Sequence, residues 1–393
     1  MSHRLFDLNP ELKRLRDEGY NVEVRNGFLV MRDVPYVTSN KEVKRGFLAT
    51  PLLMANDKVQ PPDNHTIHFG GEYPCDAAGR PIERIRNNDG PTTIESNLVA
   101  DRTFSAKPQP SGKYENYYAK VTTYADILSG PARQIDPNAN ARTFPVIQAE
   151  DGESVFRYLD TASSRAEITE ISAKLKSPRL AIVGLGGTGG YVLDLLAKTP
   201  VKEIHLFDGD VFFQHNAFRA PGAPSGEDLE QKPCKVDYFQ ALYGRMRKGI
   251  VAHPEYITSD NLKQIEGFDF VFLCMEGGDK AAIVRHLEAL RTPFIDVGMG
   301  LYVANGSLGG IIRTTTSVEG KREHVWQKKR IPFAVNADQN EYDLNIQIAD
   351  LNALNAAFAV IRWKRLVGFY LDQEAEFFST YTIGGNDIAN EDQ

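Results

Sequence analysis

Apolar and polar positions follow two different periods through the second half of the chain. Short apolar runs of strand length are separated by segments in which apolar residues recur every three or four positions, as on one face of a helix. Strands and helices that alternate in this way build a parallel sheet through right-handed crossovers, so the pattern predicts an α/β, Rossmann-like domain. The strand-like runs are residues 180–183, 203–207, 268–274 and 293–297, and the helical segments are residues 189–198, 235–247 and 279–290.

The flanking segments extend this domain. Residues 161–176 have a helical pattern ahead of the first strand. Shorter runs at residues 301–304 and 309–313 predict antiparallel strands. Residues 344–370 predict a largely apolar pair of helices, which covers either the sheet or a dimer partner.

The first part of the chain has a different character. Residues 10–18 predict a short helix, and residues 20–31 alternate around an Asn-Gly pair, which is typical of a β-hairpin. Segments rich in Pro and Gly follow. We therefore expect a separate α+β module over residues 1–155. The Rossmann-like domain, with its helical and antiparallel C-terminal closure, is expected over residues 156–393.

Length and composition narrow the class of protein. The 393 residues suffice for two or three domains, and contents of 42% hydrophobic and 25% charged residues are ordinary for a globular protein. A net charge of -7 argues against binding to nucleic acid or to an anionic membrane. The chain shows no signal-peptide core and no run long enough to span a bilayer, so we expect a cytoplasmic protein.

A glycine-rich turn follows the first predicted strand of the second domain. Small residues there allow the backbone to approach a phosphate, and the next helix directs N–H groups toward it. NAD, FAD and ATP folds share this feature, and a turn needed only for tight packing is the structural alternative. The glycines expected to contact a cofactor are Gly184, Gly186, Gly187 and Gly189.

Polar residues after the second predicted strand narrow the choice of cofactor. Asp208 ends that strand, where a carboxylate can accept both hydroxyls of a ribose. Asp210 does not belong to the NAD pattern. Asn216 and Arg219 are three residues apart and share a face, and an arginine can neutralise charge on phosphate oxygens. An Asn cap and a surface Arg are the alternative, but jointly the residues favour ATP.

Two lysines and a glutamate complete the predicted nucleotide site. Lys235 opens the next helix, where it can face the β- and γ-phosphates of ATP, and Lys232 is the alternative. Glu276, at the end of the third strand, is expected to hold Mg²⁺ together with the phosphates. No Gly-Lys-Ser/Thr sequence is present, so a P-loop is excluded.

Taken in order, these residues resemble the ThiF/MoeB/HesA superfamily, the adenylation domain of ubiquitin-activating enzymes. That family is recognised by Gly-x-Gly-Gly-x-Gly, Asp-x-Asp, Asn-x-x-Arg, a Lys, and an Asp-Asn element after the third strand. The resemblance covers residues 161–315. Glu276 stands where the family has Asp, which lengthens the side chain by one methylene, and the family's zinc cysteines are absent.

The resemblance implies a reaction and roles for the site residues. The reaction is ATP-dependent adenylation of a carboxylate, here the C-terminus of a ubiquitin-like protein, with release of pyrophosphate. ATP and Mg²⁺ are the implied cofactors. Asp208 would bind the ribose, Arg219 and Lys235 the phosphates, and Asn216 would orient the site.

The resemblance also implies partners. Family members form dimers in which an arginine ahead of the first strand enters the partner's site. Arg165 or Arg157 could serve here, with a solvated helix face as the alternative. The expected partners are therefore a ubiquitin-like protein, a second copy of the chain and a conjugating enzyme.

The three cysteines raise the question of a thioester. Their odd number and wide spacing do not indicate a disulfide framework or a tetrathiolate zinc site. Cys274 ends an apolar run and is expected to be inert. Cys75 follows a segment faintly similar to the approach to the active cysteine of ubiquitin-conjugating enzymes. Cys75 and Cys234 are both candidates to accept the acyl group, with an ordinary structural thiol as the alternative for each.

Other functions remain open from the sequence. An NAD-dependent oxidoreductase would explain the glycine turn and Asp208 but would leave Arg219 and Lys235 without roles. A non-catalytic, nucleotide-binding scaffold of a conjugation system would agree with the departure at Glu276. Within adenylation, the acceptor is either a protein or a smaller molecule, and the large N-terminal module favours a protein.

Overall fold

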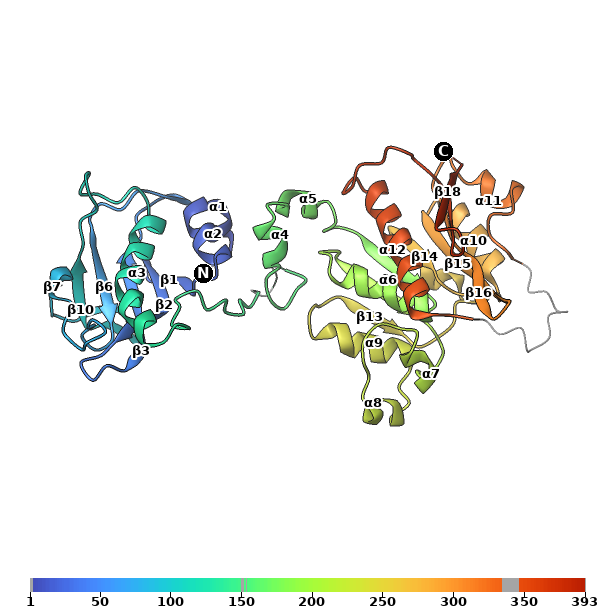
Figure 1. Cartoon of the computed structure of the whole chain (residues 1–393). Coiled ribbons are helices and arrows are strands. Elements are labelled where there is room, and N and C mark those ends of the chain that lie inside the picture. The colour runs from blue at the N-terminus through green and yellow to red at the C-terminus, as the bar shows by residue number, and fades with distance from the viewer. Residues whose placement is uncertain (1–2, 150–151, 153, 334–345, 393) are drawn as a thin grey trace. The chain divides into compact units, whose positions relative to one another are not determined.

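The computed structural model describes residues 3–149, 152, 154–333 and 346–392. The chain forms two compact units, Met1–Glu150 and Asp151–Gln393 (Figure 1). The segment just before the expected boundary at residue 155 belongs to the second unit. The backbone on both sides of residue 155 is hydrogen-bonded to residues 246–248 of the second unit. Lys248 N–H donates to the Val155 carbonyl at 2.7 Å, and Arg157 N–H donates to the Met246 carbonyl at 2.9 Å.

The first unit is built on an antiparallel sheet with the strand order β1-β2-β3-β6-β10-β7. The predicted hairpin is confirmed. Asn26 and Gly27 join its strands with φ angles of 44° and 75°, as a tight hairpin turn requires. The strands are β1 (Val22–Arg25), β2 (Phe28–Val37), β3 (Val43–Pro51), β6 (Thr66–Gly70), β7 (Arg86–Asn88) and β10 (Arg102–Ser105), with the small pairs β4 (Met54–Ala55) and β5 (Lys58–Val59), and β8 (Thr92–Glu95) and β9 (Leu98–Ala100).

Helices cover one face of this sheet. α1 (His3–Leu8) and α2 (Pro10–Asp17) come first, and α2 confirms the predicted short helix. The longest is α3 (Tyr117–Ile135), whose first turn is capped by the Asn116 side chain, which accepts the Ala119 N–H at 2.8 Å. The buried face of α3 packs into the same apolar cluster as the sheet, and its members on the helix are Tyr117, Val121, Tyr124, Ala125 and Leu128.

The second unit contains an eight-stranded sheet in the order β13-β12-β11-β14-β15-β16-β17-β18. The first five strands of this order are parallel, and the last three, β16 to β18, each run antiparallel to the strand before, so the predicted α/β fold with antiparallel C-terminal strands is confirmed. The strands are β11 (Arg179–Val183), β12 (Glu203–Phe207), β13 (Ile250–His253), β14 (Phe270–Leu273), β15 (Phe294–Ala304), β16 (Ser307–Ser317), β17 (Phe378–Thr382) and β18 (Asp387–Glu391).

Helices pack on both faces of this sheet (Figure 1). α6 (Gly187–Ala197), α9 (Lys235–Gly244) and α12 (Ala349–Leu366) share one buried apolar cluster with alternate residues of the strands. α10 (Lys280–Ala289) and α11 (Glu323–Gln327) share the cluster on the opposite face. Both faces of the parallel strands are therefore covered, as their continuous apolar runs require.

Strand order fixes where a ligand can bind. The chain passes from β11 through β12 to β13 and then returns to the other side of β11 to form β14. Neighbouring connections leave β11 in opposite directions, which opens a crevice at the carboxyl ends of β11, β12 and β14. The residues that directly follow these strands are therefore brought together.

Three details differ from the sequence-based expectations. Residues 161–176 form two short helices, α4 (Thr161–Arg165) and α5 (Thr169–Ala173), because the chain turns at Glu167, where φ is 58°. The predicted strand pieces around residue 300 are parts of the long hairpin β15–β16. The expected C-terminal helix pair is a single helix, α12, which packs on the sheet and α6; residues 344–345 of that expectation lie outside the described residues.

The remaining helical segments are short. They are α7 (Gln214–Ala217), α8 (Gly226–Glu230) and the 3-10 turns at Glu83–Ile85 and Leu262–Ile265. Within the described ranges, no helix combines the length and the apolar character needed to cross a bilayer.

Candidate functional site

A cavity of about 240 Å³ lies at the carboxyl edge of the parallel strands of the second unit. Residues that follow β11, β12 and β14 all contribute to it, as the strand order predicts. Its lining includes Gly184, Gly186, Asp208, Asp210, Arg219, Lys235, Tyr256, Ile257, Cys274, Met275, Glu276 and Gln347.

Two glycines of the turn after β11 face this cavity. Gly184 has a φ of 91°, and a Cβ there would lie 2.8 Å from the Cys274 carbonyl carbon, so a larger residue would disrupt the turn. Gly186 is open, because the nearest atom to a Cβ would be Gln347 Oε1 at 3.9 Å. The backbone is therefore exposed to a ligand at Gly186, directly before the N–H groups that begin α6.

The other two glycines serve packing and lie outside the cavity lining. A Cβ on Gly187 would lie 1.9 Å from Asn352 Nδ2 of α12, and a Cβ on Gly189 would lie 2.0 Å from the Gly184 carbonyl oxygen. Both are buried. Gly187 is thus required by the contact between α6 and α12, which the sequence motif does not reveal.

Asp208 is fixed at the end of β12. Its side chain is only 6% exposed, and its two oxygens accept backbone N–H groups, from Leu185 at 2.6 Å and from Asp210 at 2.9 Å. Each carboxylate oxygen can accept more than one hydrogen bond. Asp208 is therefore oriented by the glycine turn and retains acceptor capacity toward the cavity, which fits two ribose hydroxyls.

Lys235, Asp210 and Tyr256 form a network at the cavity. Lys235 is 5% exposed, and its Nζ lies 2.5 Å from Asp210 Oδ2 and 3.6 Å from Asp208 Oδ1. The Tyr256 hydroxyl donates to Asp210 Oδ1. Burial raises the pKa of Asp210, but the hydrogen bonds from Lys235 and Tyr256 outweigh it and hold that pKa below its usual value. The hydrogen bond to Asp210 raises the pKa of Tyr256 to about 12.

Asn216 shapes the loop that carries Arg219. Its side-chain oxygen accepts the Phe213 N–H at 2.8 Å, and its carbonyl accepts the Arg219 N–H at 3.1 Å. Asn216 is 4% exposed and does not line the cavity, so it acts on the site through the loop. Arg219 does line the cavity, and its buried Nε has no hydrogen-bond partner in the part of the chain that the structure describes. The guanidinium charge of a residue that lines the cavity can pair with an anionic ligand there.

Glu276 lies at the rim of the cavity, after β14. It is exposed, and Gln347 Nε2 is 3.5 Å from its Oε1. Gln347 Oε1 is buried without a hydrogen-bond partner among the described residues. In the described ranges no group of three or more His, Cys, Asp or Glu side chains could hold a metal ion. Glu276 alone is compatible with a Mg²⁺ whose other ligands are phosphate oxygens and water.

Two other predicted residues lie away from the cavity. Lys232 is exposed in the turn before α9, with a φ of 48°, whereas Lys235 in the first turn of α9 reaches the cavity. Of the two lysines, the geometry therefore favours Lys235. Arg165 is the exposed last residue of α4 and does not line the cavity of its own chain.

The structure does not favour Cys75 as an acyl acceptor. The sequence placed it in a loop, but its backbone bridges both Val37 and Pro81, and the residue is only 1% exposed. Burial, and secondarily the charge of Asp76, raises the pKa of its thiol. A buried, protonated thiol is a poor nucleophile.

The other two cysteines belong to the second unit. Burial raises the pKa of the Cys274 thiol, in agreement with its expected inertness. Cys234 is partly exposed at the start of α9, beside Lys235.

Three residues near the site were not found from the sequence. Tyr256 follows β13, a strand that was not predicted, and Gln347 lies at the start of residues 344–370, where only helices were expected, two residues before α12 begins. Asn352 is fully buried on α12, where it accepts from Thr188 Oγ1 at 2.8 Å and donates to the Arg219 carbonyl at 3.2 Å. The sequence did contain one signal for this contact, because Asn352 is a polar residue on the otherwise apolar face of a predicted helix.

Comparisons with known proteins agree with this architecture. Residues 162–316 match the ThiF family, and residues 10–161 match a domain of unknown function, DUF6791. No curated protein is significantly similar to the chain in sequence. The ThiF match supports ATP-dependent adenylation of a carboxylate as the general chemistry of the second unit.

Several solved structures are similar to part of this chain. Escherichia coli MccB with ATP is 17% identical, with a TM-score of 0.43 over 59% of this chain and 69% of that chain. The microcin C7 biosynthetic enzyme MccB in complex with N-formylated MccA is 16% identical, with a TM-score of 0.46 over 59% of this chain and 70% of that chain. PaaA is 15% identical, with a TM-score of 0.44 over 57% of this chain and 75% of that chain.

Proposed function

Residues 162–316 form a ThiF family domain, and from this premise we propose that the second unit adenylates the C-terminal carboxylate of a ubiquitin-like protein. One observation carries the proposal. Asp208, Arg219 and Lys235 come from three separate elements and meet around one cavity beside the turn at Gly184–Gly186. That arrangement provides an acceptor for ribose and cationic donors for phosphates in one place.

The proposed step is a displacement at phosphorus. A carboxylate oxygen of the acceptor attacks the α-phosphate of ATP, the new acyl–oxygen–phosphorus bond forms, and the bond to the β-phosphate oxygen breaks. The electron pair of that bond leaves with pyrophosphate. No general base is needed, because the attacking carboxylate is already ionised at neutral pH. The protein contributes positioning and stabilisation of charge.

Each residue role follows from its surroundings. Asp208, held by two backbone N–H groups, would accept the ribose hydroxyls. Arg219 and Lys235 would neutralise the phosphates, and Lys235 must then exchange its partner Asp210 for a phosphate oxygen. The open backbone at Gly186 would admit the phosphates close to the start of α6.

Mg²⁺ is part of the proposal, with Glu276 as its protein ligand. The metal would supply neutralisation of charge on the phosphate oxygens. The exposed position of Glu276 at the cavity rim is consistent with a metal that retains several waters.

The hairpin β15–β16 supports a protein as the acceptor. β15 pairs with β14 only through Asp296 and then continues to Ala304, so the hairpin extends past the carboxyl edge on which the cavity lies. Apolar side chains near its tip are exposed, with Tyr302 at 60%, Val303 at 67% and Leu308 at 42%. An apolar surface beside the site is suited to a folded acceptor whose C-terminal tail reaches the cavity. Homodimerisation and a conjugating-enzyme partner remain parts of the proposal.

Two alternatives make different predictions. An oxidoreductase would use the turn and Asp208 but would bind NAD without a requirement for Arg219 or Lys235. A scaffold would bind ATP without turnover. Neither is favoured by a specific contact in the described residues.

Exchange of radiolabelled pyrophosphate into ATP tests the proposal. The assay uses the full chain, Mg²⁺ and a panel of acceptors that includes small proteins ending in Gly, each compared with the same protein lacking its last two residues. We expect exchange that depends on an intact acceptor C-terminus. Nucleotide binding without exchange for any acceptor would favour the scaffold, and binding of NADH but not ATP would favour the oxidoreductase.

A further inference from the structure

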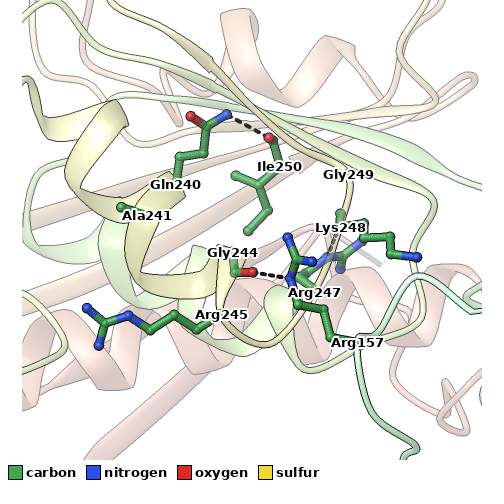
Figure 2. A pocket seen from close by; sticks show the side chains of 9 residues that line it. All are labelled: Arg157, Gln240, Ala241, Gly244, Arg245, Arg247, Lys248, Gly249 and Ile250. Carbon is green, nitrogen blue, oxygen red and sulfur yellow. Dashed lines mark hydrogen bonds between the residues drawn. The ribbon is translucent and has the colours of Figure 1, made fainter. Parts of the chain in front are cut away.

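A second cavity of the second unit, of about 550 Å³, does not provide a further anion site. Figure 2 shows the heads of Arg245 and Lys248 pointing to opposite sides, and the buried Arg247 donates to backbone carbonyls, so the cations do not converge. Gly244, at the C-terminal end of α9, also lines this cavity, and the carbonyl end of a helix disfavours an anion. The nucleotide cavity, by contrast, is lined by Gln347, a polar residue from a distant part of the chain.

Gln347 connects the C-terminal part of the chain to the nucleotide cavity. Among the described lining residues, only Gln347 comes from the chain beyond the parallel strands, and it lies two residues before α12. Asn352 on α12 anchors this segment, because it accepts from Thr188 Oγ1 at 2.8 Å and donates to the Arg219 carbonyl at 3.2 Å. Its own N–H donates to the Ile348 carbonyl at 2.9 Å. The backbone next to Gln347 is therefore held against α6 and the loop that carries Arg219.

The side chain of Gln347 lies between two parts of the proposed phosphate site. Its Oε1 is 3.9 Å from the position that a Cβ on Gly186 would occupy, and Gly186 is where the backbone is open to the phosphates. Its Nε2 is 3.5 Å from Oε1 of Glu276, the proposed ligand of Mg²⁺. The amide is therefore beside both groups that would flank the phosphates of a bound nucleotide.

The hydrogen bonds of this amide are weak or incomplete. The contact with Glu276 is long for an N–H···O bond, and Gln347 Oε1 is buried with no partner in the part of the chain that the structure describes. An amide nitrogen carries two N–H donors. A ligand can therefore recruit the Gln347 amide without breaking a strong contact.

We propose that Gln347 is a phosphate-binding residue of the nucleotide site, whose amide N–H donates to a phosphate oxygen of ATP. The proposal rests on the proposed function, since it takes ATP as the ligand of this cavity. The charged residues of the lining are three carboxylates and two cations, Asp208, Asp210, Glu276, Arg219 and Lys235. Because the carboxylates outnumber the cations, an additional neutral donor would help to hold an anionic triphosphate.

Titration of the full chain with ATP and Mg²⁺, measured by calorimetry without any acceptor, tests this proposal. Gln347→Met keeps a side chain of similar size but removes the amide, so we expect ATP affinity to fall by about tenfold or more, with little change in thermal unfolding. Adenosine lacks the phosphates and should bind the variant and the wild type equally.

The matched control is Gln327→Met. Gln327 is exposed on α11, its Nε2 also lies 3.5 Å from a glutamate oxygen, Glu323 Oε2, and it is outside the lining of the nucleotide cavity. This control should bind ATP as the wild type does.

Unchanged ATP affinity in Gln347→Met would overturn the proposal, because it would show that the side chain only fills the cavity wall. An equal loss for ATP and adenosine would also overturn it, since the contact would then be to the nucleoside. Either result leaves adenylation intact if the wild type exchanges pyrophosphate. Conversely, the expected loss of ATP affinity in a protein that exchanges no pyrophosphate would support Gln347 and reject adenylation. A wild type that binds no ATP would reject both.

Discussion

The ammonium group of Lys235 lies 2.5 Å from the carboxylate of Asp210, and both residues line the same cavity. Asp208 is the second carboxylate near this ammonium group, at 3.6 Å. An entering triphosphate would therefore compete with Asp210 for Lys235. The ion pair holds the lysine at the cavity and keeps the two carboxylates from facing each other without a cation.

Lys235→Ala should abolish most pyrophosphate exchange. The substitution removes a phosphate contact and leaves two uncompensated carboxylates beside an anionic ligand, so we expect a loss of about 100-fold or more. Lys232→Ala is the matched control, since Lys232 is exposed outside the cavity. Equal losses in both variants would show that the geometry has selected the wrong lysine.

Arg219→Ala should separate activity from stability. The Arg219 carbonyl, which accepts from Asn352, is retained in the variant, and its buried Nε has no partner to lose in the described part of the chain. We expect exchange to fall by about 100-fold or more, with a change in unfolding free energy of less than about 1 kcal/mol. Exchange is measured beside thermal unfolding, and a folded variant with full exchange would exclude Arg219 from the site.

Substitution by alanine should affect the adjacent residues Gly186 and Gly187 differently, one in nucleotide binding and the other in stability. Gly187→Ala places a Cβ 1.9 Å from Asn352 Nδ2 and should destabilise the second unit by about 1–3 kcal/mol, with partial recovery when Asn352→Ala is added. Gly186→Ala meets nothing closer than 3.9 Å and should fold normally but bind ATP more weakly. Chemical unfolding and ATP titration measure the two effects. A stable Gly187→Ala protein would contradict the packing role.

Lys120 in the first unit should make stability depend on pH. It is 1% exposed on α3, donates to Thr50 Oγ1 at 2.8 Å, and burial lowers its pKa to about 8. Between that value and the ordinary pKa of about 10.4, the unfolded chain binds more protons, so stability rises with pH.

The expected gain between pH 8 and 10.5 is up to about 3 kcal/mol. It should appear as a difference between the wild type and Lys120→Met in calorimetric unfolding at several pH values. Taking the difference removes the contribution of the tyrosines and the other lysines. A difference that does not change across this range would mean that Lys120 is not buried with a lowered pKa.

Any thioester should form on Cys234 and not on Cys75. Cys75 is buried with a raised thiol pKa, whereas Cys234 is partly exposed at the start of α9. If incubation with ATP and an acceptor yields an adduct sensitive to thiols, we expect Cys234→Ala to abolish it and Cys75→Ala to retain it. Loss of the adduct only in Cys75→Ala would require the first unit to open during the reaction.

The sequence predicted the features that depend on local periodicity and short motifs. The parallel strands, the hairpin at Asn26 and the positions of Asp208 and Arg219 near one edge all follow from patterns within about ten residues. Strand β13 was missed because its four residues are too short a run to stand out as a strand in the sequence.

Features that depend on distant contacts could not be predicted. Gly187 has the appearance of a phosphate-binding glycine, and only the position of Asn352, which lies 165 residues later in the chain, shows that it serves packing. Cys75 is likewise flanked by polar residues, but its backbone bridges bury it.

A crystal structure of the protein with a non-hydrolysable ATP analogue tests the central claim most directly. The account predicts the ribose hydroxyls on Asp208, the phosphates on Arg219, and Lys235 turned from Asp210 to a phosphate oxygen. An empty cavity, or a bound nucleotide with Lys235 still paired to Asp210 and its phosphates directed away from Arg219, would contradict it.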